Sequence, residues 1–121
     1  MILIFAMMLV GSYGDNILLS KSYENCISTG DAGEGVQSAM QECIDREFSV
    51  QDGRLNQAYK MKMLSLPGDK KLILRGMQRQ WIKDRDRRCE AEGEGSLDRF
   101  IADQCLTLET QKRTRWLELY K

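Results

Sequence analysis

The sequence predicts an all-α protein, and three observations support that prediction. β-branched residues are sparse, and no long run alternates apolar with polar side chains, so we expect little or no sheet. Apolar residues instead recur at spacings of three and four, which places them on one face of a helix. The four cysteines among 121 residues are typical of a small domain with two disulfides. We therefore expect a compact four-helix antiparallel bundle, or a stack of helical hairpins, closed by two disulfides.

The N-terminus carries an unbroken apolar segment over residues 2–10. It is too short to cross a bilayer, since a spanning helix needs about 20 residues. Its length fits a secretory signal peptide, and the small residues Ser12 and Gly14 suit the −3 and −1 positions of a cleavage site. The absence of Lys or Arg directly after Met1 argues against this, and a buried first strand or helix is the alternative. We expect a signal peptide at 1–14, a helical domain at 15–121, and export to the periplasm.

All four cysteines, Cys26, Cys43, Cys89 and Cys105, lie in the expected mature part. Of the three possible pairings we favour Cys26–Cys43 with Cys89–Cys105, because each closes a short loop and the two pairs fall in separate halves. Each bridge would stabilise the fold by roughly 3 kcal/mol through chain entropy. A zinc site made by all four cysteines is the alternative, but no C-x2-C spacing supports it.

Glycine clusters and Pro67 divide the chain into four helical segments. We expect helices over residues 34–50 and 51–66, and a third from Asp69 as N-cap to about residue 91. The fourth should follow the glycines at 93 and 95, with Ser96 as N-cap. Residues 17–19 should form a short turn or a packed arm, and residues 28–35 a loop tied down by Cys26.

Two charged residues, Asp52 and Arg85, fall within the apolar stripes. A buried arginine must find a carboxylate or carbonyls, or cost several kcal/mol. We therefore expect Arg85 to pair with Asp52, although Asp52 can also serve as a simple helix cap. Trp81 should be a core residue rather than a platform for a ligand. The predicted structural polar core comprises Asp52, Asn56, Tyr59, Gln78, Trp81 and Arg85.

The net charge is zero, but the charges are distributed unevenly. Residues 15–53 carry eight acids and two bases, residues 54–88 carry eleven bases and three acids, and residues 89–121 carry seven acids and five bases. The basic middle segment raises nucleic-acid binding as a possibility. Export and the acidic flanks argue against it, so we expect the segments to pair with one another across the fold.

The residue types argue against catalysis. The chain has no histidine, which removes the commonest general base and metal ligand. Oxidised cysteines provide no thiolate, and no phosphate-binding glycine motif occurs. Glu90, Glu92 and Glu94 could act as glycosidase carboxylates, but nothing apolar surrounds them to raise a pKa, and solvated acids are the simpler interpretation. We expect no enzyme activity, no cofactor and no metal site.

Several motifs together resemble the LprI-like family of lysozyme inhibitors. They are Asp52-x-x-Leu55-Asn56-x-x-Tyr59, Gln78-Arg79-x-Trp81-Ile82-x-x-Arg85-Asp86-x-x-Cys89, Gly95-Ser96, Cys105-Leu106 and Thr110-x-x-Arg113. The resemblance implies an all-helical, disulfide-bonded domain of the periplasm or cell envelope and, for some members, inhibition of lysozyme. The chain departs from the family pattern by having Glu94 where a double glycine is common, and by lacking a lipoprotein cysteine after the apolar segment.

These observations lead to one expected function and one alternative. The expected function is a periplasmic binding protein that inhibits lysozyme or a related cell-wall hydrolase, with a protein partner, no nucleic acid and no stable membrane span. The alternative is a non-inhibitory envelope partner, or an immunity-type protein that binds another exported protein. The candidate partner-binding loop, which the Cys89–Cys105 bridge would hold as a protrusion, comprises Glu90, Glu92, Gly93, Glu94, Gly95 and Ser96. An ordinary solvated turn is the simpler interpretation of this loop.

Overall fold

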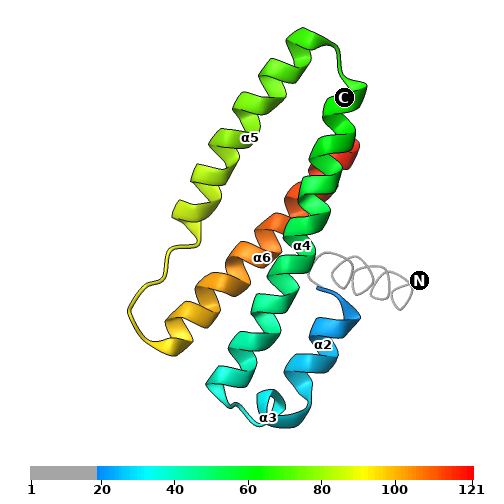
Figure 1. The fold of residues 1–121 in the computed structure, drawn as a ribbon. Coiled ribbons are helices and arrows are strands. Elements are labelled where there is room, and N and C mark those ends of the chain that lie inside the picture. The colour runs from blue at the N-terminus through cyan, green and yellow to red at the C-terminus, as the bar shows by residue number, and fades with distance from the viewer. Residues whose placement is uncertain (1–18) are drawn as a thin grey trace, which may run out of the picture.

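The computed structural model describes residues 19–121, which form five helices and no strand. The helices are α2 (Lys21–Ser28), α3 (Gly30–Gly33), α4 (Gln37–Ser65), α5 (Gly68–Arg88) and α6 (Ser96–Leu119). Helices α4 and α6 pack along each other, α2 and α3 lie against the first half of α4, and α5 diverges from the other helices (Figure 1). The predicted all-α fold with two disulfides is confirmed, whereas the predicted signal peptide lies outside the described residues.

The division into two helices at residues 34–50 and 51–66 was wrong, because α4 is one continuous helix of 29 residues. A single glycine costs a helix only about 1 kcal/mol. Gly53 lies on an open side of α4, with nothing within 4 Å of the position a Cβ would take. The helix therefore continues as far as Ser65, just before Pro67, and spans about 44 Å at 1.5 Å per residue.

The start of α5 lies two residues before the predicted one, and the start of α6 lies one residue before it. Asp69 and Ser96 were predicted as N-caps, but Pro67 and Gly95 hold those positions, so both predicted caps lie inside the first turn. At the start of α6 the carboxylate of Asp98 accepts a hydrogen bond from the Gly95 N–H at 3.2 Å. An acid in the first turn is also favoured by the helix dipole.

The segment predicted as a loop at residues 28–35 contains the short helix α3, entered at Gly30 and left at Gly35. Both glycines have positive φ angles, 56° and 87°, which non-glycine residues rarely adopt. Helix α5 ends at Arg88 rather than near residue 91, because the chain turns where Cys89 is bonded to Cys105.

The first hydrophobic core lies where α2 and α3 cover α4 and α6. It contains Leu19, Tyr23, Ala32, Cys43, Ile44 and Phe100. The buried carboxylate of Glu47 accepts hydrogen bonds at 2.7 Å from both the backbone N–H and the hydroxyl of Ser20, and at 3.1 Å from Gln51 Nε2. These bonds satisfy the carboxylate and fix the start of α2 on α4. Leu19 is packed, as predicted for the arm before α2.

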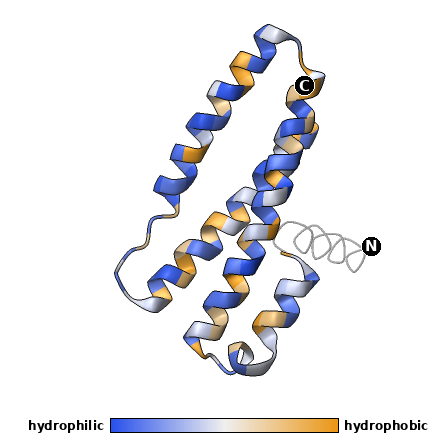
Figure 2. Cartoon of the chain, in the orientation of Figure 1, coloured by the Kyte–Doolittle hydropathy of each residue, from blue (hydrophilic) through white to orange (hydrophobic). Residues whose placement is uncertain are grey.

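The second core joins α4, α5 and α6 through Leu55, Leu74 and Leu117. Leu74 and Leu117 are fully buried, and Trp81, Trp116 and Tyr120 pack around them. Polar and apolar residues are interspersed along every helix in Figure 2, so each helix can bury one side and expose the other. Helix α5 depends on this second core, because it makes few other contacts with the rest of the fold.

Leu117→Ala is expected to lower the free energy of unfolding by about 2–5 kcal/mol, because it opens a cavity at a fully buried position. Urea denaturation followed by circular dichroism measures the change. Leu119→Ala is the matched control on the same helix, since Leu119 is 72% exposed, and it should change stability by less than about 0.5 kcal/mol. Equal effects of the two substitutions would contradict the assignment of this core.

Removing the Cys26–Cys43 bridge with a double Cys→Ser substitution is expected to cost roughly 3 kcal/mol of stability, because the bridge restricts the unfolded chain over a separation of 17 residues. Hydrogen exchange should show faster exchange in α2 and α3 than in α6. Uniform exchange along the chain would show that this bridge does not specifically hold α2 and α3 on α4.

Candidate partner-binding surface

The predicted ion pair between Arg85 and Asp52 was wrong. Arg85 instead lies 3.0 Å from the carboxylate of Asp86, and its Nη1 donates to Thr110 Oγ1 at 3.1 Å. The pair with Asp86 forms easily because the two residues are neighbours in the chain. The bond to Thr110 forms because α6 lies closer to this part of α5 than α4 does (Figure 1). Arg85 therefore joins α5 to α6 and needs no carboxylate from α4.

A stack of guanidinium and indole groups supplements this link. The guanidinium carbon of Arg113 lies 3.7 Å from the ring centroid of Trp116 and 5.3 Å from that of Trp81. Its Nε donates to Gln78 Oε1 at 2.9 Å, and burial lowers the pKa of Arg113. Trp81 is half-buried against the second core, as its predicted core role requires. The stacking of Arg113 between the two tryptophans was not predicted, although the Thr110-x-x-Arg113 motif places both residues on one face of α6.

The remaining residues of the predicted polar core line an open hollow. Asp52 is half-buried, Asn56 is exposed, and the bond from Asn56 Nδ2 to Asp52 Oδ2 measures 3.5 Å. The hollow lies between α4 and α5 and has a volume of about 380 Å³. Its lining residues are Asp52, Leu55, Asn56, Tyr59, Arg75, Gln78, Arg79, Ile82 and Arg85. The two polar motifs thus meet in space at this hollow, where Gln78 is buried as predicted while Asp52 and Asn56 reach the surface.

A second hollow lies between α4 and α6, with a volume of about 940 Å³. Four cations line it, Arg54, Lys62, Lys112 and Arg115, and Lys62 Nζ donates to the Tyr120 carbonyl at 2.8 Å. None of the polar residues of the sequence motifs lines this hollow. The smaller hollow is therefore the one on which the motif residues converge.

The predicted partner-binding loop connects α5 and α6, and residues 90–96 are all exposed. It is fixed at one end by the Cys89–Cys105 disulfide and at the other by the bond from Gly95 to Asp98. A Cβ at Gly93 would lie 2.6 Å from the Asp98 carboxylate, so a larger residue there would displace this side chain. The structure thus places the loop residues together in a protruding segment that is anchored at both ends.

The expectation that the charged segments pair across the fold was wrong. Among residues 19–121 the ion pairs are Arg85–Asp86, Arg87–Asp84, Arg88–Glu109 and Arg99–Asp103, and only Arg88–Glu109 joins two of the three segments. Residues 19–50 and 90–103 gather toward one end of the molecule and carry eleven acids and three bases (Figure 1). Residues 54–88 and 104–121 carry fifteen bases and five acids. Charge is therefore segregated along the long axis.

A small domain closed by two disulfides is typical of exported proteins. The chain belongs to the LprI lysozyme-inhibitor family, whose model matches residues 28–117. It is also 30% identical over 93 residues to an uncharacterized protein of Rhizobium meliloti (strain 1021), an alignment that covers 63% of this chain and 67% of the relative. No solved structure matches the chain.

Membership of an inhibitor family is consistent with a role other than catalysis, and the disulfides and the family both fit an exported protein. Bonding of the four cysteines in pairs excludes the alternative of a four-cysteine zinc site. Within residues 19–121 no cluster of three or more metal-binding side chains forms. In the same part of the chain, no helix is both long enough and apolar enough to cross a membrane.

Arg113→Ala is expected to loosen α5 selectively, because it removes the stack on Trp81 and the bond to Gln78. Amides of residues 68–88 should exchange with solvent at least about tenfold faster, the effect of losing roughly 1.4 kcal/mol of local stability, while those of α4 change little. Arg115→Ala is the control, since Arg115 is exposed on the same helix. Unchanged amide exchange in α5 would contradict the claim that Arg113 holds α5 on α6.

Proposed function

We propose that this protein binds and inhibits a lysozyme or a related cell-wall hydrolase in the periplasm, after removal of residues 1–14 as a signal peptide. The supporting observation is the match of the lysozyme-inhibitor family model to residues 28–117, which include three of the four disulfide cysteines, all of α5 and α6 as far as residue 117. The fold supplies what such a role needs, namely a small preorganised scaffold that loses little entropy on binding.

The loop of residues 90–96 is the contact surface that we propose. A glycosidase cleft carries two carboxylates, so the exposed hydroxyl of Ser96 and the N–H of Gly93 suit its interior. Glu90, Glu92 and Glu94 suit a basic rim around such a cleft, where rim charges mainly accelerate association. The anchors at Cys89 and Gly95 reduce the ordering cost of binding.

The acidic end of the molecule also supports the loop of residues 90–96 as the contact surface. The loop lies at that end, next to the start of α6 (Figure 1). A basic partner would be attracted to this end and repelled by the opposite one, which orients the encounter before contact. The net charge of zero contributes nothing to this steering, so it depends on the segregation of charge.

The direct test is a titration of the purified mature chain against c-type, g-type and i-type lysozymes, with hydrolysis of cell walls as the readout. Inhibition of at least one class at micromolar protein is expected, and it should weaken under reductant because both bridges are lost. Binding to none of the lysozymes or related hydrolases, measured by calorimetry, would refute the proposal. Binding without inhibition would favour the alternative of a non-inhibitory or immunity-type partner.

The contact surface has its own test. Replacing Glu90, Glu92 and Glu94 together with Gln is expected to slow association with the inhibited lysozyme about tenfold at low salt, because rim charges act on the association rate. The matched control replaces three other exposed acids, which are Glu24 on α2, Glu34 in the turn between α3 and α4, and Glu42 on α4. An equal effect of the two triple variants would show that the loop is not specifically involved.

A further inference from the structure

The polar motif residues of α4 and α5 face an open hollow instead of bonding to each other. Asp52, Asn56 and Tyr59 form the α4 wall, and Arg75, Gln78 and Arg79 form the α5 wall. Among residues 19–121, no hydrogen bond or ion pair joins these two walls. The short contacts of the lining residues run elsewhere, such as Gln78 to Arg113 and Arg85 to Thr110. Bonding between the helices therefore does not explain why these polar side chains converge.

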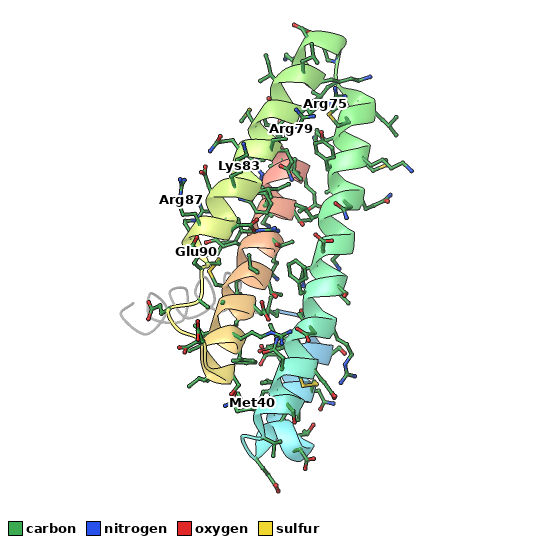
Figure 3. All side chains as sticks on the ribbon, turned by 60° about the vertical axis from the view of Figure 1, so that its left-hand side comes forward. Met40, Arg75, Arg79, Lys83, Arg87 and Glu90 are labelled. Carbon is green, nitrogen blue, oxygen red and sulfur yellow. A yellow bond between two sulfur atoms is a disulfide. The ribbon has the colours of Figure 1, made fainter. Side chains whose placement is uncertain are left out.

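The two arginines of the α5 wall are the most informative members of this group. Arg75 and Arg79 are exposed and lie four residues apart, which places their Cβ atoms about 5–6 Å from each other. No carboxylate within residues 19–121 comes within ion-pair distance of either one, unlike Arg85, Arg87 and Arg88 of the same helix. Figure 3 shows Arg75 and Arg79 between α5 and α4, whereas Arg87 lies at the outer edge of α5. Two free guanidinium groups thus border one hollow.

The chemistry of the lining residues defines the ligand that fits. A guanidinium presents a planar pair of donors that matches a carboxylate. Opposite the arginines, Asp52 and Asn56 offer acceptors and an amide donor for hydroxyl or amide groups. Leu55, Tyr59 and Ile82 add apolar contact area. Asp52, opposite the two arginines, lowers the net positive charge of the lining and so reduces the advantage that a dianion such as phosphate would have over a single carboxylate.

We propose that the hollow between α4 and α5 binds a small ligand bearing one carboxylate together with hydroxyl or amide groups, of the size of a single acidic sugar residue. Its volume of about 380 Å³ falls near the lower end of the range for small-molecule sites. The loop of residues 90–96 is a separate part of the surface. The hollow can therefore bind its ligand whether or not the protein inhibits a lysozyme.

Two sugars that differ in one carboxylate test the proposal directly. N-acetylmuramic acid carries a lactyl carboxylate that N-acetylglucosamine lacks, and each is titrated into the disulfide-bonded protein while backbone amide NMR signals are recorded. Saturable shifts in residues 52–59 and 75–82 are expected for N-acetylmuramic acid, with a Kd of about 1 mM or tighter. N-acetylglucosamine should bind at least about tenfold more weakly.

Single substitutions identify the side chains that bind the carboxylate of N-acetylmuramic acid. Arg79→Gln should weaken the binding of N-acetylmuramic acid about tenfold or more, and Arg75→Gln provides a second measurement if the first variant does not fold. Arg87→Gln is the control, because Arg87 is a cation of the same helix that lies outside the hollow. Absence of saturable binding, equal affinity for the two sugars, or equal effects of Arg79→Gln and Arg87→Gln would overturn the proposal.

Discussion

The attachment of α5 to the α4–α6 pair is the constraint on which the surface features depend. Leu74 enters the core beside Leu55 and Leu117, and Arg113 stacks on Trp81 and Trp116 while its Nε binds Gln78. Few other contacts hold this helix. The distance between α5 and α4, and hence the width of the hollow, is set by this cluster. The loop of residues 90–96 leaves from the end of the same helix, so its direction is set there too.

The two halves of the molecule are held by different means. Around α2 and α3 the stabilising contacts are the Cys26–Cys43 bridge, a compact apolar cluster and the buried carboxylate of Glu47. A buried charge is costly unless hydrogen bonds satisfy it, and Ser20 and Gln51 supply three such bonds. Around α5 the contacts are longer cationic and aromatic side chains that keep partial exposure. The second half is therefore more open and leaves polar side chains free for a ligand.

The segregation of charge affects recognition more than stability. The ion pairs are mainly local ones within α5 or α6, and exposed pairs of this kind contribute little to folding. An acidic end and a basic end on a chain of zero net charge give the molecule an electric dipole along its long axis. The loop of residues 90–96 lies at the acidic end, whereas the hollow between α4 and α5 lies among basic residues. Each of these two surfaces is thus suited to a partner of opposite charge.

Local chemistry explains what could be predicted from the sequence. The spacing of apolar residues predicted helices in all the main segments, Pro67 predicted the break between α4 and α5, and the positions of the cysteines favoured the pairing that the structure shows. The predicted break between residues 50 and 51 was wrong, because Gly53 lies on an open helix face and costs the helix less than the packing on the opposite side contributes. Family membership also followed from motif residues that could be identified along the chain.

The sequence alone determined the helical class and the family, and it favoured the two bridges without fixing them, because these features depend on residue type and on spacing along the chain. Only the tertiary structure decided the partners of the polar residues. Asp52 and Arg85 have opposite charges and could form an ion pair, but α5 diverges from α4. Asp52 therefore lines the hollow, and Arg85 pairs with Asp86 and donates to Thr110. The angle between α4 and α5 depends on the packing of Leu74 and Trp81 against Leu117 and Arg113 of α6, and periodicity within one helix contains no information on that angle.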